Sequence, residues 1–444
     1  MIIGIRREDK NRWERRVPLT PQDVGALIRE RGLRFHVQPS PIRVFPDGEY
    51  AAAGAEVRED LRACDFIVGV KEVPPALLIP KKSYLFFAHV IKCQPYNMPM
   101  LRRLLDLGCT LLDYELITDT AGRRLVFFGR YAGLAGMIDT LHALGERLTI
   151  EGIANPFAEI RLAHEYADLG HAEAAVERLG ARIAAEGLDP RVSPLIFGFA
   201  GYGHVSQGAQ EILDRLPVKT LAPSEVAGLR GSGTASNRAV YKVVFKEEHL
   251  VVPRDAGAKF ALQDYYDHPE RYRSTFTDYL PHLSVLVNGI FWTERYPRLV
   301  TKEAVAALFA NGARPQLRVI GDISCDIDGS VEITRKSTEP DQPCFVYEPA
   351  TGRIRDGYAG EGPVVMAVDN LPCELPRESS AFFSHVLKDF VGALTSADLS
   401  AGFEKLALPD SLERAVIALR GELRPRFAYI GEHLGVSPAD AEHP

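Results

Sequence analysis

The sequence predicts an α/β protein with two domains, each built around a parallel β-sheet. Three observations lead to this fold class. The chain has 444 residues, which is more than one ordinary core accommodates. Short apolar segments alternate with helical stretches, as they do where helices cover a parallel sheet. A glycine-rich turn occupies residues 201–208, in the middle of the chain rather than near its start.

Composition and charge narrow the class of partner. Apolar residues make up 46% and charged residues 25%, which is typical of a folded globular protein. The formal net charge of -7 argues against nucleic acid, whose binders concentrate Lys and Arg, so we expect small-molecule partners. The six cysteines show neither metal-ligand spacing nor a disulfide framework, so we expect no metal and a cytoplasmic location. We expect no membrane association, because no segment approaches the ~20 apolar residues of a span.

The first domain is expected over residues 1–135. Thr20 as N-cap and Pro21 at the first helical position mark the start of a helix over 21–31. The apolar runs that predict strands lie at 2–5, 35–37, 66–70, 84–88 and 110–114. This region is therefore predicted to be an α/β unit of its own.

The second domain is expected over residues 136–325. A helix over 157–187, interrupted near Gly170, precedes the segment VSPLIFGFAGYGHVSQGAQEILDRLPVKTLAP. That segment has the pattern of a strand, a glycine turn, an amphipathic helix and a second strand. It predicts the opening βαβ unit of a Rossmann-like dinucleotide-binding domain.

Strands at 284–290 and 317–323 would extend the second sheet. Residues 326–444, with a helical tail from about Arg377, are expected to return to the first domain. The substrate domain would then be discontinuous, and a cleft between two Rossmann-like domains would hold the ligands.

The glycine turn has the pattern Gly201-x-Gly203-x-x-Ser206-x-Gly208, with serine where a third glycine usually stands. The first glycine permits the tight turn, the second lets the backbone approach the pyrophosphate, and the following helix amides hold the phosphate charge. A plain strand-to-helix turn is the alternative, but the flanking strand and helix favour a nucleotide. The candidate cofactor-binding residues in the turn are Gly201, Gly203, His204, Val205 and Ser206.

The type of cofactor depends on a side chain about 20 residues further on, where a carboxylate would hold the ribose 2′-hydroxyl of NAD and repel the 2′-phosphate of NADP. The second strand, VKTLA, runs into Ser224 without a carboxylate, although Glu225 follows. Arg230 and Arg238 lie downstream and could pair with a phosphate, but surface positions explain them equally well. We expect NADPH (NADP) with contacts from Ser224 and Arg230, and NADH is less favoured.

Polar side chains follow three strands of the first domain. FIVGV runs into Lys71 and Glu72, YLFFA into His89, and TLLDY into Glu115. Parallel strands present their carboxyl ends at one edge, so these groups should converge. A buried lysine has a lowered pKa, a carboxylate raises it, and histidine titrates near neutrality, which suits proton transfer. Each residue alone is compatible with a solvated or buried structural position, and only their shared edge favours function.

Basic residues add to the same edge. Arg15, Arg16 and Lys92 would lie nearby, where a guanidinium could bind a substrate carboxylate through two hydrogen bonds. Arg123 and Arg124 are weaker candidates, because basic residues on loops are usually exposed.

Nine segments together resemble a known family. They are IGIRREDKNRWERRVPLTP, GVKEVP, FFAHVIK, DYE, FGRYAGLAGMI, GYGHVSQGAQ, NGIFW, GDISCDIDGSVE and VDNLPCELP. In this order, from about residue 2 to residue 390, they resemble the lysine-ketoglutarate reductase domain of the bifunctional aminoadipic semialdehyde synthases. More distantly, the chain resembles fungal saccharopine dehydrogenases and the alanine dehydrogenase and transhydrogenase fold.

The resemblance implies a reductive condensation in lysine catabolism. The ε-amine of L-lysine joins the ketone of 2-oxoglutarate, and NADPH reduces the resulting imine to saccharopine. It implies that Lys71 and His89 are the catalytic acid-base groups. The expected substrate-binding residues are Arg16, Glu72, Lys92, Glu115 and Asp326, with the two glutamates tuning the lysine and Asp326 marking the return to the first domain.

The sequence also departs from the family. Tyr202 and His204 stand where smaller or amide residues are expected in the animal enzymes, which affects the nucleotide contacts. The dehydrogenase half of the bifunctional enzymes is not part of the 444 residues, so we expect either a separate saccharopine dehydrogenase or a different pathway. Two alternatives stay open: an NAD-dependent, lysine-forming saccharopine dehydrogenase or related opine-type enzyme, and a nucleotide-binding regulator without turnover. The paired acid-base groups argue against the regulator.

Overall fold

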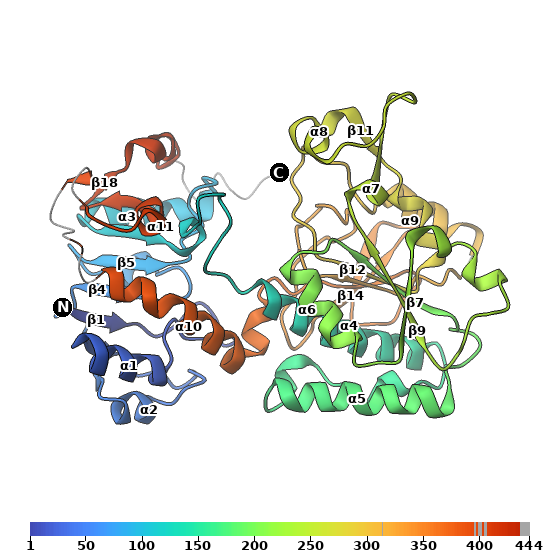
Figure 1. Ribbon diagram of the computed structural model, residues 1–444, viewed down its shortest axis with the longest axis horizontal. Helices are drawn as coiled ribbons and strands as arrows, with labels where there is room; N and C mark the ends of the chain where they lie inside the picture. Colours follow the sequence, from blue (N-terminus) through green and yellow to red (C-terminus); the bar gives the residue numbers. More distant parts are fainter. Residues whose placement is uncertain (313, 395–396, 398–401, 404–405, 436–444) are drawn as a thin grey trace. The chain divides into compact units, whose positions relative to one another are not determined.

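A computed structural model describes residues 1–312, 314–394, 397, 402–403 and 406–435 (Figure 1). The chain divides into two compact units. Unit 1 comprises Met1–Phe128 and Pro376–Pro444, and unit 2 comprises Gly129–Leu375.

Unit 1 contains an eight-stranded sheet with the order β18-β17-β6-β5-β4-β1-β2-β3. Its strands are β1 (Ile2–Ile5), β2 (Arg34–Val37), β3 (Glu56–Val57), β4 (Phe66–Val68), β5 (Ser83–Phe86), β6 (Thr110–Asp113), β17 (Val416–Leu419) and β18 (Glu422–Leu423). The first six are parallel, β17 pairs antiparallel with β6, and β18 pairs antiparallel with β17 at the edge of the sheet. All five strands predicted for the first domain are therefore present.

The helices of unit 1 are α1 (Pro21–Arg31), α2 (Asp47–Ala52), α3 (Met98–Asp106), α10 (Pro376–Leu394) and α11 (Asp410–Ala415). The Thr20 side chain accepts a hydrogen bond from the Asp23 amide, as predicted for the start of α1. The C-terminal helix α10 packs against this start, because the Thr20 amide donates to Ser384 Oγ at 2.9 Å. Phe383 and Leu387 of α10 join the core of unit 1.

Unit 2 contains a second eight-stranded sheet, with the order β15-β14-β16-β13-β12-β7-β9-β8. Its strands are β7 (Leu195–Ala200), β8 (Val218–Leu221), β9 (Val240–Phe245), β12 (Val285–Asn288), β13 (Val319–Asp322), β14 (Cys344–Glu348), β15 (Arg353–Asp356) and β16 (Val364–Met366). Within this sheet, β14 pairs in antiparallel fashion with both of its neighbours, β15 and β16, and the other described pairs are parallel. A separate ribbon joins β10 (Val251–Pro253) to β11 (Tyr272–Ser274).

The main helices of unit 2 are α4 (Gly129–Ile150), α5 (Leu169–Glu186), α6 (His204–Leu213), α7 (Glu247–Leu250), α8 (Leu262–Asp267) and α9 (Lys302–Leu308). Helices α4 and α6 lie side by side (Figure 1). A Cβ atom at Gly133 would lie 2.0 Å from the Val205 carbonyl oxygen, and one at Gly208 would lie 2.1 Å from the Arg130 carbonyl oxygen. Gly208 thus permits the close helix packing that the missing third glycine of the turn would serve.

Two expected boundaries are wrong. Residues 326–375 do not return to the first domain, because β14, β15 and β16 pair within the unit 2 sheet, and the chain returns at Pro376. The helix expected over 157–187 begins only at Leu169, because Asp168 caps it by accepting a hydrogen bond from the His171 amide at 2.9 Å.

Two buried carboxyl groups hydrogen-bond to each other in unit 2. Asp139 lies on α4, Glu374 directly precedes the return to unit 1, and both are almost fully buried. Asp139 also accepts the Ala163 amide at 2.8 Å, and His164 Nδ1 lies 3.3 Å from Glu374. Burial raises the pKa of Asp139 well above its usual range and raises the pKa of Glu374 to about 8.

The carboxyl pair makes the stability of unit 2 depend on pH. Because both pKa values are raised in the folded state, the stabilisation is complete below the unfolded-state pKa and is lost as pH rises toward about 8. We expect the free energy of unfolding, measured in urea, to fall as pH rises from about 4.5 to about 8, by up to about 1.4 kcal/mol per pH unit for each group. Asp139→Asn keeps a donor toward Glu374 and should flatten this dependence. An unchanged slope in that variant would exclude the pair as its source.

Candidate active site

The backbone that carries Lys71 is fixed by a buried carboxylate. Glu8 accepts hydrogen bonds from the Val70 amide at 2.7 Å and the Lys71 amide at 3.0 Å. It lies just after β1, whereas Lys71 follows β4, so it ties together the loops after two neighbouring strands. Sequence analysis missed Glu8, because nothing in the RREDK segment distinguishes a buried carboxylate from an exposed one.

The environment of Lys71 lowers the pKa of its ammonium group. Burial lowers the pKa of its ammonium, and the nearby Arg16 charge lowers the pKa further. Glu14 and Glu72 act in the opposite direction. A partly buried amine with a lowered pKa is suited to general base catalysis.

Arg16 is engaged by a partner within unit 1. Its guanidinium donates to both carboxylate oxygens of Glu14, at 2.8 and 2.6 Å, and both residues are buried. The guanidinium also lies 4.3 Å from the centre of the Phe128 ring. A substrate carboxylate that binds Arg16, as the sequence predicts, would have to compete with Glu14. In the structure, the Arg16 charge lowers the pKa of Lys71.

His89 and Glu72 form the second part of the site. His89 Nδ1 lies 2.8 Å from Glu72 Oε1, and Lys10 Nζ lies 3.3 Å from the other oxygen. Burial alone would raise the pKa of Glu72, but the hydrogen bond from His89 and the charge of Lys10 lower it to about 2. Because an ionised carboxylate only accepts, Nδ1 carries the hydrogen and Nε2 is the nitrogen left for other partners.

The backbone at His89 is strained. Its φ of 51° lies in the left-handed region, which non-glycine residues rarely adopt. The ring stacks on Phe87, and the Asn97 side chain donates to the His89 carbonyl at 3.2 Å. Such strain persists only where surrounding contacts hold it, and it is enriched at functional sites.

Behind His89 lies a buried carboxyl group that the sequence did not single out. Asp113, the last residue of β6, accepts hydrogen bonds from the Ala88 amide at 3.2 Å and the Glu115 amide at 2.9 Å. Burial and the charge of Glu115 raise the pKa of Asp113 to about 7. Asp113 therefore joins the loop after β5 to the loop after β6.

The remaining expected substrate ligands are less closely grouped. Glu115 pairs with Arg124 at 2.7 Å, so this arginine is a partner of the site carboxylate rather than an isolated surface charge. Lys92 is exposed on the loop after β5. Asp326 is an exposed residue of unit 2 after β13, and the expectation that it marks the return to the first domain is wrong.

The glycine turn fits a dinucleotide. Gly201 has a φ of 92°, which favours glycine, and a Cβ at Gly203 would meet nothing within 4 Å, which leaves room for a phosphate. Helix α6 starts directly after Gly203, and none of the side chains that the structure describes caps its first turn. The amides of His204 and Val205 therefore begin an uncapped helix whose positive end suits a pyrophosphate. Ser206 is buried and accepts from Gln210 at 3.0 Å, so its hydroxyl is already used within α6.

The other two expected cofactor ligands do not lie beside this turn. The Arg230 guanidinium donates to the Pro194 carbonyl at 3.0 Å and contacts Ser284 Oγ at 3.3 Å. Both partners directly precede strands, so Arg230 lies at the amino edge of the sheet, opposite the glycine turn. Ser224 follows β8, which β9 separates from β7. The sequence-based assignment failed because it assumed that the next strand in the chain is the next strand in the sheet.

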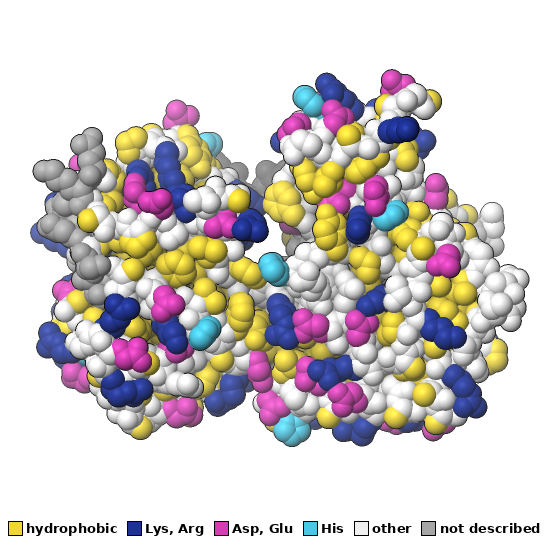
Figure 2. Space-filling model, viewed as in Figure 1, with side chains coloured by type: hydrophobic (Ala, Val, Ile, Leu, Met, Phe, Trp, Pro, Cys, Tyr) yellow, Lys and Arg dark blue, Asp and Glu magenta, His cyan; other side chains and the backbone are white. Residues whose placement is uncertain are grey.

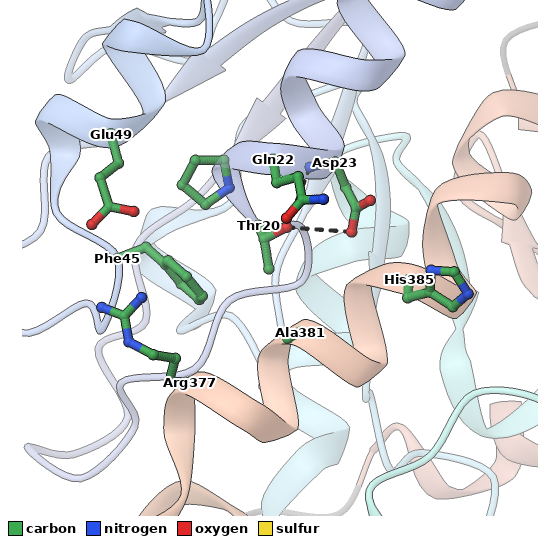
Figure 3. Close-up of a pocket in the computed structure, with 9 residues that line it drawn as sticks. Thr20, Gln22, Asp23, Phe45, Glu49, Arg377, Ala381 and His385 are labelled. Atoms are coloured by element: carbon green, nitrogen blue, oxygen red, sulfur yellow. Dashed lines mark hydrogen bonds between the residues drawn. The ribbon is translucent and has the colours of Figure 1, made fainter. Parts of the chain in front are cut away.

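A separate cavity of about 410 Å³ lies within unit 1 between α1 and α10 (Figure 3). Two of its charged side chains have structural partners: Asp23 accepts from Ser384 at 2.5 Å, and Arg377 lies over Phe45 and donates to the Val44 carbonyl. These groups hold α10 and the loop before α2 in place. On the face shown in Figure 2, acidic and basic side chains are interspersed over each unit, unlike the one-sign surface of a nucleic-acid binder.

Comparison with known proteins supports the resemblance. Residues 4–135 match the family "Alanine dehydrogenase/PNT, N-terminal domain". The chain is 38% identical to an alpha-aminoadipic semialdehyde synthase of Arabidopsis thaliana, over 99% of the chain and 42% of that protein. It is 37% identical to the mitochondrial enzyme of Bos taurus, over 97% of the chain and 47% of that protein. The chain thus spans less than half the length of these relatives, which give no support for a separate partner protein.

More distant proteins share the fold. A saccharopine dehydrogenase [NAD(+), L-lysine-forming] of Neurospora crassa is 28% identical, over 87% of the chain and 89% of that protein. The structure of an L-alanine dehydrogenase matches with a TM-score of 0.61 at 20% identity, covering 98% of this chain and 100% of that one. A transhydrogenase from Sinorhizobium meliloti matches with a TM-score of 0.57 at 15% identity, covering 96% and 100%. The expected fold class is confirmed.

Two further findings concern the described part of the chain. None of its helices combines the length and apolar character that a membrane span requires. No three of its His, Cys, Asp or Glu side chains group in a way that would hold a metal ion. The family match and the sequence similarity together show that residues 4–135 resemble the alanine dehydrogenase/PNT N-terminal domain and that nearly the whole chain is similar to part of the alpha-aminoadipic semialdehyde synthases.

Proposed function

We propose that the chain is an NADPH-dependent lysine-ketoglutarate reductase that condenses L-lysine with 2-oxoglutarate to give saccharopine. The observation that carries this proposal is the acid-base group of unit 1, in which Lys71 has a lowered pKa and His89 is paired with an ionised Glu72. The similarity to the semialdehyde synthases supports the choice of substrates.

The proton steps follow from these groups. Neutral Lys71 accepts a proton from the substrate ε-ammonium, which frees the amine to attack the ketone carbon. His89 donates a proton to the hydroxyl of the resulting carbinolamine, which leaves as water. Glu72 stabilises the charged imidazole through its 2.8 Å contact. The nicotinamide, when bound, supplies the hydride that reduces the imine.

The cofactor site of the proposal is the glycine turn. The backbone of Gly201 and Gly203 and the amides at the start of α6 would hold the pyrophosphate. We propose NADPH as the cofactor and NADH as the weaker alternative. The cytoplasm is the proposed location, since all six cysteines are free thiols, although the Bos taurus relative is named as mitochondrial.

A second candidate is the NAD-dependent reaction toward lysine, which the name of the Neurospora crassa relative favours. One assay separates the candidates. Purified protein should oxidise NADPH only when L-lysine and 2-oxoglutarate are both present, with saccharopine identified by mass spectrometry. A higher kcat/KM for saccharopine with NAD would favour the second candidate. No turnover with any amine and oxo acid pair would contradict both and favour a nucleotide-binding regulator.

The charge of Glu72 should set the pH at which the reductase becomes active. Glu72 raises the pKa of Lys71, so Glu72→Gln should lower that pKa further and make the neutral base available at lower pH. The ascending limb of kcat/KM should move to lower pH. Glu59→Gln, which removes an exposed partner of Arg7, is the control and should leave the limb in place. A limb that moves up would contradict the assignment of Lys71 as the base.

A further inference from the structure

The strand order of unit 2 changes which residue faces the cofactor ribose. In dinucleotide-binding sheets, the strand beside the glycine strand ends next to the adenosine ribose. Here β7 carries the glycine turn, and its neighbour on that side is β9 rather than β8. The pairing of β7 with β9 runs in parallel through six residues, from Leu195 with Val240 to Ala200 with Phe245. Strand β8 pairs only with the far side of β9.

The register identifies the residue at the end of β9. The Gly201 amide donates to the Phe245 carbonyl at 3.1 Å, so the ladder continues one step beyond the last paired strand residues. Lys246 is the next residue, its backbone is extended with φ -100° and ψ 171°, and it is exposed. A lysine thus stands beside the first glycine of the turn, at the strand end where NAD-binding folds carry a carboxylate.

The charged residues next to Lys246 in the chain have partners of their own. Glu247 accepts a hydrogen bond from the Tyr266 hydroxyl at 2.8 Å, and the Tyr202 hydroxyl lies 3.5 Å from the same oxygen. His249 Nδ1 accepts the Lys246 amide at 3.0 Å, while Glu248 lies 3.8 Å from the other ring nitrogen. Lys246 Nζ lies 5.9 Å from the centre of the Tyr202 ring, on the glycine turn itself. The Glu247 carboxylate is therefore engaged by two tyrosine hydroxyls, whereas the Lys246 ammonium lies over the Tyr202 ring of the turn.

We propose that Lys246 binds the 2′-phosphate of the adenosine ribose and thereby selects NADPH over NADH. This inference rests on the proposed function only in taking the glycine turn as a nicotinamide dinucleotide site. An ammonium binds a phosphate dianion as a point charge and gains nothing comparable from a ribose hydroxyl. Cofactor selectivity would thus come from β9, which follows β8 in the chain but lies next to β7 in the sheet.

Calorimetry without lysine or 2-oxoglutarate tests the proposal. Lys246→Met should weaken the binding of NADPH and of 2′,5′-ADP by about tenfold or more, and leave NADH and 5′-AMP within about twofold. Lys246→Arg should restore most of the affinity. Lys219→Met on β8 is the matched control, since it removes an exposed lysine of the neighbouring strand.

Each outcome bears on a different claim. Equal weakening of NADPH and NADH in Lys246→Met, or no weakening of NADPH, would overturn the proposal, as would a wild-type protein that binds NADH more tightly. Wild-type protein that binds NADPH through Lys246 but forms no saccharopine would contradict the proposed reaction and leave the role of Lys246 intact.

Discussion

Replacing Lys71 with methionine should lower the turnover of saccharopine formation by about 10²- to 10⁴-fold, the range that general base catalysis contributes. Methionine keeps much of the side-chain volume and cannot accept a proton. The backbone at position 71 is held by Glu8 through main-chain amides, so the turn should keep its shape. Steady-state rates with NADPH, L-lysine and 2-oxoglutarate measure the effect.

Nucleotide binding separates a chemical loss from a structural one. The Kd for NADPH should be unchanged in Lys71→Met, because the glycine turn belongs to unit 2. Lys82→Met, which removes another partly buried lysine of unit 1, should retain wild-type turnover. A near-normal rate in Lys71→Met would show that another group carries the proton.

Alanine substitutions at two glycines of the α6 region should affect different properties, the stability of unit 2 in one variant and NADPH binding in the other. Gly208→Ala would place a Cβ atom 2.1 Å from the Arg130 carbonyl, so α4 and α6 would have to separate, and unit 2 should lose about 3 kcal/mol or more of stability. Gly203→Ala meets nothing within 4 Å and has a negative φ, so its thermal midpoint should equal that of the wild type. Its methyl group would instead occupy the space of the pyrophosphate and weaken NADPH binding by more than about tenfold.

Thermal melting with and without NADPH distinguishes these two roles. Gly228→Ala adds a methyl group 3.9 Å from its nearest neighbour, the Glu225 carbonyl oxygen, and it serves as the control for both measurements. Unchanged NADPH affinity in Gly203→Ala would contradict the assignment of the turn as the phosphate site. Unchanged stability in Gly208→Ala would show that the two helices can separate at little cost.

Local signals in the sequence predicted where α1 begins and where the parallel strands of unit 1 lie. Thr20 and Pro21 marked the start of α1, and apolar runs located the parallel strands of unit 1. The polar residues after those strands were also identified, because a parallel sheet presents its strand ends at one edge. Of these, His89 and Glu72 are in direct contact, as the shared edge predicted.

Pairing across long distances was not predictable in the same way. The insertion of β9 between β7 and β8 has no local signature in the sequence. The sequence therefore pointed to Ser224 and Arg230 as cofactor ligands, whereas the residue at the end of β9 is Lys246. The backbone at Lys71 depends on Glu8 and the charge around Lys71 depends on Glu14, and the burial of both residues follows from three-dimensional packing. In a sequence, their carboxylates look the same as exposed ones.

Asp113 couples the two loops that carry His89 and Glu115. A single buried carboxylate receives amides from the loops that carry His89 and Glu115, so a displacement of one loop strains the hydrogen bond to the other. Substitutions at His89 and Glu115 should therefore show non-additive effects on catalysis although their side chains have different partners.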